Sequence, residues 1–280
     1  MVKKVIKGPT RNYKAREHWR KAYEGMIQMR KEFEVPVAGE GCSNLADFTE
    51  SPEVVRFQTL VSLMLSAQTK DTMTGKVMRK LRSNGLTLQR IIETETKSLS
   101  QEIYGVSFHN NKAKYIKKVA EILKEKYNSD VPRDYKALLK LPGVGPKMAL
   151  LFMKSCYGEI HGIAVDTHVH RISNWLGWVE TKTPEQTRKE LESFLPEEVW
   201  PGVNRNLVGF GHTICKPVNP QCGKCKIVHL CPTGSKKLKL NNANQTKKPL
   251  NQEETQPNLK RKKEEDKKPR KKHAKNQEEA

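Results

Sequence analysis

The residues that could perform chemistry in this chain lie close together in the sequence. Residues 141–147 read Leu-Pro-Gly-Val-Gly-Pro-Lys, and residues 165–168 read Val-Asp-Thr-His. Glycine allows a sharp turn and a close approach of the backbone to a ligand, and proline suits the first position of a helix. The sequence therefore predicts a glycine turn that points backbone N–H groups, and the positive end of a helix, at an anion.

Lys147 and Asp166 are the candidate reactive groups. The helix that Lys147 begins would bury a face formed by residues at positions i, i+3, i+4 and i+7, which leaves the lysine facing a cleft; that face contains Met148, Leu151, Phe152 and Ser155. A lysine attacks only as a free amine, and a helix N-terminus and desolvation both disfavour the ammonium form. A carboxylate could stabilise positive charge and assist proton transfer. The simpler interpretations are a phosphate contact for Lys147 and a helix cap for Asp166.

Four cysteines occur near the end of the apolar part of the chain, with six, two and five residues between them: Cys215, Cys222, Cys225 and Cys231. Such spacing can chelate one metal centre. Structural zinc usually uses two short pairs of ligands, and only one such pair is present, so spacing favours a [4Fe–4S] cluster and leaves zinc as the alternative. Cys42 and Cys156 have no partner at ligand spacing and are expected to be buried thiols.

The composition indicates a polyanionic partner. The 280 residues carry a formal net charge of +21. Of this, +8 lies from Gly234 onward and +13 lies on residues 1–233, so the part with apolar residues is itself basic. No run of 18 apolar residues and no secretory signal is present, so we expect an intracellular protein without a membrane span, and cysteines that are not disulfide-bonded.

The secondary-structure signals are helical throughout. Helices are predicted from Ser51 and Pro52 to near Gln68, over 114–127, over 135–141, and from a capping box at 183–186. Residues 36–47 are expected to form a loop, and no sustained alternating pattern indicates a strand. An all-α fold follows.

The two ends of the chain differ in composition from its middle. Residues 1–33 are rich in Lys and Arg, which fits either a DNA-facing arm or a mitochondrial transit signal. From 234 onward few large apolar residues remain, so disorder is expected. Basic clusters at 260–263 and 267–272 resemble a bipartite nuclear localisation signal, with a solvated basic tail as the alternative.

Together, the glycine turn with its lysine, the run Val-Asp-Thr-His-Val-His-Arg at 165–171 and the cysteine spacing resemble the endonuclease III family of DNA glycosylases, in its eukaryotic form, over about residues 20–233. The resemblance implies an all-α helix-hairpin-helix DNA glycosylase fold. It implies a [4Fe–4S] cluster as cofactor. The expected parts are a basic arm (1–19), a segment packing with the iron–sulfur domain (20–49), a six-helix barrel (50–160), the iron–sulfur domain (161–233) and a disordered tail (234–280).

By the same resemblance, Lys147 is the expected nucleophile and Asp166 the catalytic carboxylate, while Cys215, Cys222, Cys225 and Cys231 hold the cluster. Gln68, in Ser-Ala-Gln, matches the family's residue that fills the space of an extruded base. Residues 106–110 depart from the family's wedge motif, which leaves Phe108 unassigned as the wedge. The residues expected to contact DNA are Gln68, Lys112, Gly143, Val144, Gly145 and His168.

The function implied is that of a bifunctional glycosylase and AP lyase, which removes oxidised pyrimidines through a lysine Schiff base and cuts 3′ to the AP site by β-elimination. Its partner would be double-stranded DNA carrying such lesions or AP sites, bound by a monomer in the nucleus, with the mitochondrion as a second location. The alternatives are a noncatalytic helix-hairpin-helix module and a monofunctional adenine glycosylase of the same fold, against which the presence of Lys147 argues.

Overall fold

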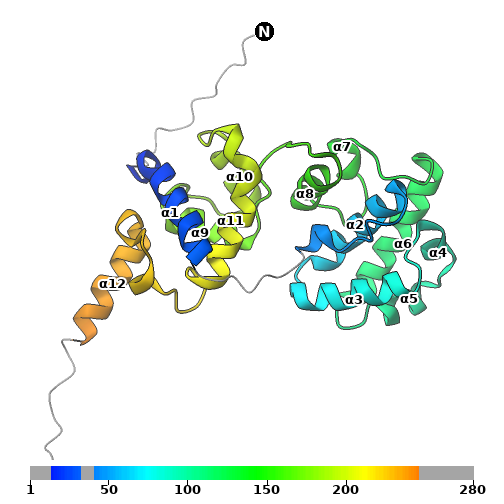
Figure 1. Ribbon diagram of the computed structural model, residues 1–280, viewed down its shortest axis with the longest axis horizontal. Helices are drawn as coiled ribbons and strands as arrows, with labels where there is room; N and C mark the ends of the chain where they lie inside the picture. The colour runs from blue at the N-terminus through cyan, green and yellow to red at the C-terminus, as the bar shows by residue number, and fades with distance from the viewer. Residues whose placement is uncertain (1–13, 33–40, 246–280) are drawn as a thin grey trace, which may run out of the picture.

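The computed structural model describes residues 14–32 and 41–245 (Figure 1). These residues form helices and connecting turns, and no strand occurs within the two described ranges. None of the helices in these ranges is long and apolar enough to cross a membrane. The basic clusters at 260–263 and 267–272 and residues 1–13 of the basic arm lie outside the described residues.

Two helical bodies lie side by side (Figure 1). One contains α2 (Pro52–Ser66), α3 (Asp71–Ser83), α4 (Leu88–Glu93), α5 (Thr96–Glu102), α6 (His109–Lys126), α7 (Tyr135–Leu138) and α8 (Pro146–Tyr157). The other contains η1 (Lys14–His18), α1 (Trp19–Glu32), α9 (Thr167–Trp175), α10 (Pro184–Glu192), α11 (Trp200–Thr213) and α12 (Pro232–Gln245). Each body has its own cluster of buried apolar side chains. We call them the α2–α8 body and the α1/α9–α12 body.

Helix α2 is the centre of the α2–α8 body. It begins at Pro52, after Ser51, and its residues from Phe57 to Leu65 are all buried. A helix that is buried on every side must satisfy its polar side chains internally. Gln58 does so by accepting from the backbone N–H of Asp47 at 2.7 Å and donating to the carbonyl of Leu86 at 3.1 Å. The middle of α2 is thereby joined to the segments around Asp47 and Leu86, and the helix packs against α8.

The α1/α9–α12 body is completed by the N-terminal helix. Helix α1 packs against α11, and Arg30 donates to Asn206 at 2.9 Å, while Asn206 donates to the hydroxyl of Tyr23 at 2.8 Å. Gly202 and Gly209 of α11 allow this close approach, because a Cβ at either would lie 2.6 Å from the Tyr23 hydroxyl or 3.1 Å from Arg30. The segments that precede and follow the α2–α8 body in the sequence therefore share one apolar core.

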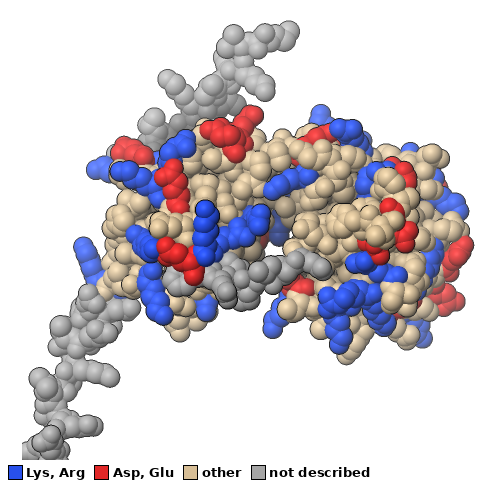
Figure 2. Space-filling view, viewed as in Figure 1, with Lys and Arg blue, Asp and Glu red and all other residues tan. Residues whose placement is uncertain are grey.

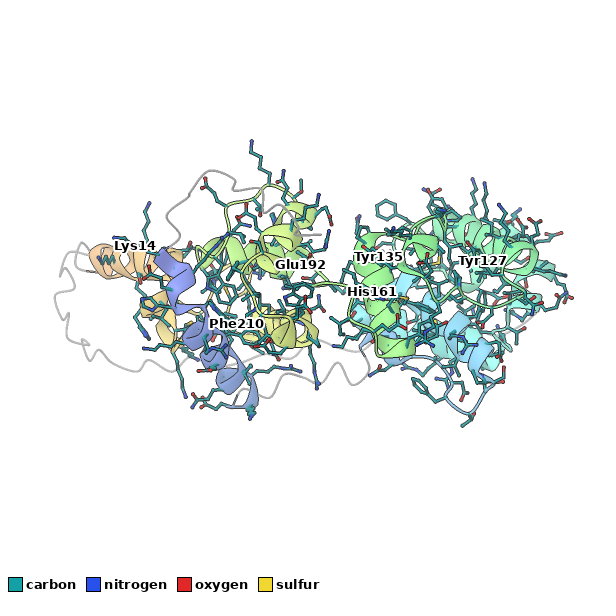
Figure 3. All side chains as sticks on the ribbon, turned by 90° about the horizontal axis from the view of Figure 1, so that it is seen from above. Lys14, Tyr127, Tyr135, His161, Glu192 and Phe210 are labelled. Carbon is teal, nitrogen blue, oxygen red and sulfur yellow. The ribbon has the colours of Figure 1, made fainter. Side chains whose placement is uncertain are left out.

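The segment between α8 and α9 is fastened to both bodies (Figure 3). The ring of His161 stacks on that of Tyr135 with centroids 5.9 Å apart, and Glu192 accepts from the backbone N–H of Ile163 at 2.8 Å. In addition, the amine of Lys154 on α8 donates to the carbonyl of Pro201 at 2.5 Å. These contacts restrain the position of one body relative to the other.

The structure agrees with the predicted elements in part. The helix predicted at 114–127 begins earlier, as α6 at His109, and the one predicted at 135–141 ends at Leu138. The capping box of α10 forms as predicted, with Thr183 and Gln186 each accepting from the other's backbone N–H.

Composition predicts disorder from residue 234, whereas the structure continues as helix α12 through Gln245. Contacts beyond its own sequence stabilise its start. The hydroxyl of Ser235 donates to the carbonyl of Val228 at 2.8 Å, and the amine of Lys237 lies 4.5 Å from the centroid of the Trp175 ring. Composition alone does not include such tertiary contacts.

Candidate active site and cysteine-lined cavity

The glycine turn before α8 has the geometry that its sequence predicts. Gly143 adopts φ +80°, and a Cβ there would lie 3.0 Å from the ring of Tyr115. Gly145 is the N-cap of α8, Pro146 follows it in the first turn, and no side chain caps this end. The first N–H groups of a helix have no partner within the helix, so this end of α8 can bind an anion. The side chain of Val144 points into the core.

Lys147 and Asp166 meet at the N-termini of two helices from different bodies. The amine of Lys147 lies 3.7 Å from Oδ2 of Asp166. The lysine side chain is 41% exposed and the aspartate 15%, so the amine can be reached while the carboxylate is largely shielded. Oδ1 of Asp166 accepts from the backbone N–H of Val169 at 2.9 Å and so caps α9. Asp166 therefore uses one carboxylate oxygen to cap α9 and the other to contact Lys147.

A cavity of about 340 Å³ adjoins Lys147 and is lined from both bodies. Ser66 and Ala67 at the end of α2 form one wall, and the first two turns of α8 form another. The third comes from the start of α10 and its N-cap, with Thr183, Pro184, Glu185 and Arg188. Its volume lies within the range of about 300–1,000 Å³ that small-molecule sites occupy. A group the size of one nucleobase could therefore be brought beside the amine.

Arg188 and Glu185 were not singled out from the sequence, yet both line this cavity. Arg188 contacts Glu185 and Glu192 at 2.6 Å each. The i, i+3 and i, i+4 spacing of these charges on α10 was visible in the sequence, but only the fold shows that they lie opposite Lys147.

The two histidines after Asp166 have different surroundings. His170 hydrogen-bonds the hydroxyl of Thr187 at 2.6 Å and so joins α9 to α10. His168 packs edge-on to the ring of His212, with centroids 4.6 Å apart, and burial lowers its pKa. A neutral His168 beside Asp166 is therefore favoured at pH 7. DNA contact by His168 stays a prediction.

Gln68 and Phe108 both occupy turns with left-handed backbone conformations, at φ +52° and +58°. Both side chains are accessible from outside, and that of Phe108 is 62% exposed. Left-handed conformations are unusual for residues with a Cβ. The backbone N–H of Ser107 donates to the hydroxyl of Thr69 at 3.2 Å, so the two turns are joined.

Lys112, which we expected to contact DNA, points into the protein instead. Its amine is buried and donates to the carbonyls of Leu65 and Ala67 and to the hydroxyl of Thr69, at 2.7, 2.6 and 3.1 Å. Burial lowers its pKa to about 8, so the ammonium form still predominates at pH 7. A phosphate contact would require the amine to leave all three acceptors. A positive charge in the sequence does not reveal that its side chain points inward.

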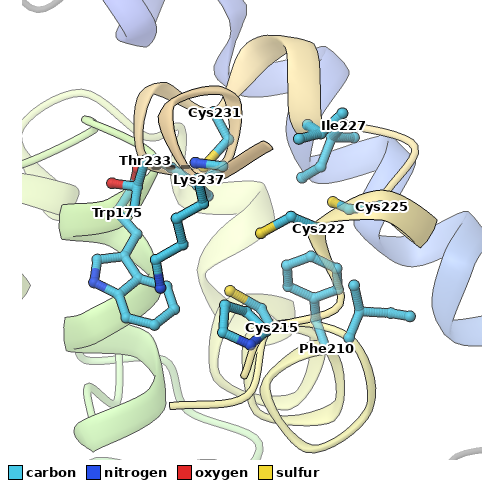
Figure 4. Close-up of a pocket in the computed structure, with 14 residues that line it drawn as sticks. Trp175, Phe210, Cys215, Cys222, Cys225, Ile227, Cys231, Thr233 and Lys237 are labelled. Atoms are coloured by element: carbon cyan, nitrogen blue, oxygen red, sulfur yellow. Dashed lines mark hydrogen bonds between the residues drawn. The ribbon is translucent and has the colours of Figure 1, made fainter. Parts of the chain in front are cut away.

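The four cysteines line a single cavity between α9, α11 and α12 (Figure 4). Apolar residues, among them Trp175, Phe210 and Ile227, form much of the rest of the wall. The side chains of Cys215 and Cys222 point toward each other across the cavity (Figure 4). In residues 14–32 and 41–245, no three His, Cys, Asp or Glu side chains converge closely enough to hold one metal ion. Four cysteine thiols that share one cavity are the set of donor groups that a [4Fe–4S] cluster takes.

The surroundings of these thiols affect metal binding in opposite directions. Burial raises the pKa of Cys215 to about 12 and that of Cys225 to about 11, so a bound metal has to displace their protons. The sulfur of Cys231 accepts from the backbone N–H of Gly234 at 3.2 Å, and Arg171 donates to the carbonyl of Cys215 at 2.6 Å. Arg171, for which the motifs predicted no role, thus joins the helix capped by Asp166 to the cysteine loop.

Comparison with known proteins supports a repair function for this arrangement. Residues 61–197 match the family described as HhH-GPD superfamily base excision DNA repair protein. The chain is 47% identical over 222 residues to Endonuclease III-like protein 1 of Gallus gallus, covering 79% of each chain. It is 48% identical over 218 residues to the protein of that name from Mus musculus, covering 77% of this chain and 73% of the relative.

Solved structures give the same result. The structure of a non-covalent Endonuclease III–DNA complex matches with a TM-score of 0.69 at 32% identity, over 80% of this chain and 98% of that one. A trapped Endonuclease III–DNA covalent intermediate, the estranged-adenine complex, matches with a TM-score of 0.68 at 31% identity and the same coverage.

The two glycines of the turn give a matched pair for testing its geometry. We expect Gly143→Ala to lower the free energy of unfolding by about 2 kcal/mol, because alanine at positive φ is strained and its Cβ meets Tyr115. Gly145→Ala, whose φ is −101° and whose added Cβ meets nothing within 4 Å, should lower it by no more than about 1 kcal/mol, because alanine is only a poorer N-cap than glycine. Denaturant unfolding measures both; equal effects would contradict the assignment.

Proposed function

Because this chain belongs to the endonuclease III family of HhH-GPD base excision DNA repair proteins, and is accordingly a DNA glycosylase, we propose that it removes oxidised pyrimidines and then cuts the strand as an AP lyase. The observation that supports this most directly is the 3.7 Å approach of the Lys147 amine to Asp166, at the edge of a cavity that could take one base. A glycosylase that used only water would not require an amine at this position.

The chemistry begins when the lesion leaves the duplex. Flipping costs a few kcal/mol and is easiest for bases that stack or pair poorly. The Lys147 amine then attacks C1′; a C1′–N bond to the lysine forms, and the bond to the base breaks with its electron pair leaving on the base. Asp166 stabilises positive charge at C1′ and helps to move a proton from the lysine to the departing base.

Strand cutting follows from the same covalent bond. The C1′–O4′ bond of the aminal then breaks and O4′ takes up a proton, while the lysine nitrogen forms a double bond to C1′. The resulting protonated Schiff base acidifies the protons on C2′. When one such proton is removed, its electron pair forms the C2′–C3′ double bond. The bond from C3′ to the phosphate oxygen then breaks, and the 3′ phosphate leaves with that electron pair. Water then releases the lysine from the sugar. The trapped covalent intermediate described in the matching endonuclease III structure supports this route.

We also propose that Cys215, Cys222, Cys225 and Cys231 hold a [4Fe–4S] cluster, since all four line one cavity. Such a cluster would join four points of an otherwise irregular loop. The loop carries Lys216 and Lys224, both exposed, so its shape determines where these charges lie relative to DNA.

The charge distribution supports binding to the DNA backbone. Lys and Arg side chains are spread over both bodies on the face seen in Figure 2. Phosphate contacts release counterions, so affinity should fall steeply with salt. We further propose that the protein is a monomer and that it is located in the nucleus, with the mitochondrion as a second location. The basic N-terminal arm and the basic clusters that these locations depend on extend outside the described residues.

Replacement of the nucleophile tests the reaction class. Lys147→Gln should lower strand cleavage of a thymine-glycol duplex, and the borohydride-trapped adduct, by at least about a thousandfold, because no amine remains to attack. DNA affinity should stay within a few fold. Lys118→Gln, which removes an equal charge from α6, serves as control and should cleave normally. Cleavage retained by the Lys147→Gln variant would leave a noncatalytic role for Lys147 as the better interpretation.

Replacement of the carboxylate separates its two contacts. Asn is as good a helix cap as Asp, so Asp166→Asn keeps the cap, and the loss of the charge beside Lys147 should lower the thermal midpoint by only about 2–4 °C. The loss of charge should slow single-turnover base release by about 10²–10⁴-fold. A variant that unfolds more readily but turns over normally would show that Asp166 is only a cap.

Metal content tests the cluster. Protein purified without oxygen should be brown and carry about four iron atoms per chain. Cys225→Ser should lose the iron and Cys156→Ser should keep it, because Cys156 packs against the core of the other body. Stoichiometric zinc in colourless protein would overturn the assignment.

A further inference from the structure

Lys112 and Thr69 join the two exposed turns that carry Gln68 and Phe108. The backbone N–H of Lys112 donates to the carbonyl of Phe108 at 3.0 Å, because Phe108 is the N-cap of α6. The side chain of the same lysine reaches the other turn and donates to the carbonyl of Ala67, directly before Gln68, at 2.6 Å. One residue thus contacts the backbone of both turns.

Thr69 supplies the second connection. Its hydroxyl accepts from the Lys112 amine at 3.1 Å and from the backbone N–H of Ser107 at 3.2 Å, while it lies 3.2 Å from the carbonyl of Ala67. The hydroxyl and the ammonium therefore form one compact network between residues 65–69 and 107–112. Thr69 was not singled out from the sequence.

The network stabilises the end of α2 and the two turns that follow it and precede α6. The last carbonyls of a helix lack partners within it, and a cation there is favourable, so the Lys112 ammonium satisfies the end of α2 at Leu65. Left-handed conformations at Gln68 and Phe108 persist only when their surroundings hold them. Three acceptors around one buried cation provide such a restraint.

We propose that Lys112 and Thr69 are positioning residues that fix Gln68 and Phe108 at one separation and orientation, so that both side chains enter the DNA stack together. This rests on the proposed function, in which a base leaves the duplex; the exposed side chains of Gln68 and Phe108 are assigned here as the groups that approach the strand when it does. Pre-organised turns avoid the cost of ordering them during flipping. Base removal from a duplex should then depend on the network, whereas cleavage of an AP site in single-stranded DNA, where no stack is opened, should not.

Lys117 provides a matched control on the same helix. Its amine donates to the carbonyls of Ile92 and Thr94 at 3.0 and 2.5 Å, so it also satisfies backbone groups, but at a different loop. Lys112→Met and Lys117→Met remove similar contacts from α6. Only the first removes contacts to the turns of Gln68 and Phe108.

The experiment compares these variants in three measurements. Lys112→Met should slow single-turnover excision of thymine glycol from a duplex by about tenfold or more. It should also reduce the fluorescence rise of 2-aminopurine placed beside the lesion, and speed amide hydrogen exchange at residues 66–69 and 106–108. Lys117→Met should stay within about twofold of the unmodified protein in all three. Both variants should cleave a single-stranded AP site at the unmodified rate.

Thr69 variants test the network without removing a charge. Thr69→Val, of similar shape, should slow duplex excision, and adding it to Lys112→Met should give little further loss because both act on one network. Thr69→Ser keeps the hydroxyl and should restore excision. These variants also decide the outcome if Lys112→Met does not fold.

Two results would overturn the proposal: equal effects of Lys112→Met and Lys117→Met, or normal excision and exchange in Thr69→Val. Failure of the proposed function would look different. An unmodified protein that excised no oxidised pyrimidine would contradict the substrate assignment, while hydrogen exchange at the two turns would still report whether the network holds them.

Discussion

The carboxylate of Asp166 is the point on which the candidate active site depends. One oxygen caps α9, and the other lies beside the amine that begins α8. Two helix N-termini and an ammonium all place positive charge in this region, and the largely shielded carboxylate of Asp166 is attracted to all three. The reactive lysine is consequently placed by the fold of both bodies, since α8 belongs to one and α9 to the other.

That dependence explains why the boundary between the bodies is held by several different contacts. Stacking of His161 on Tyr135, the bond from Ile163 to Glu192 and that from Lys154 to Pro201 restrain the segment that joins α8 to α9. Small shifts at such a boundary would change the distance between an amine and a sugar carbon, and reaction rates are sensitive to displacements of about 1 Å. The cavity walls shared by α2, α8 and α10 depend on the same restraints.

Local signals in the sequence were sufficient for the helical class, the glycine turn and the capping box of α10, because each depends on neighbouring residues. Gly143 adopts the positive φ that its turn requires, and Thr183 caps a helix through residues three positions away. Tertiary partners were not predictable in this way. The inward direction of Lys112, the junction at Thr69 and the stabilisation of α12 by Trp175 all depend on groups distant in sequence. A motif identifies a reactive lysine, but only packing distinguishes an exposed lysine from a buried one.

The N-terminal helix packs with parts of the chain that come much later. Arg16 pairs with Glu190 at 2.9 Å, and the apolar face of α1 is covered by α11. On a ribosome, about 10–40 s would separate synthesis of α1 from that of Cys231, at roughly 5–20 residues per second. All residues of the α2–α8 body are synthesised before then, so this body can fold first. The apolar face of α1 stays exposed until α11 has been synthesised. Folding of the cysteine-lined half is thus a late event, which ties assembly of the active site to the completion of the chain.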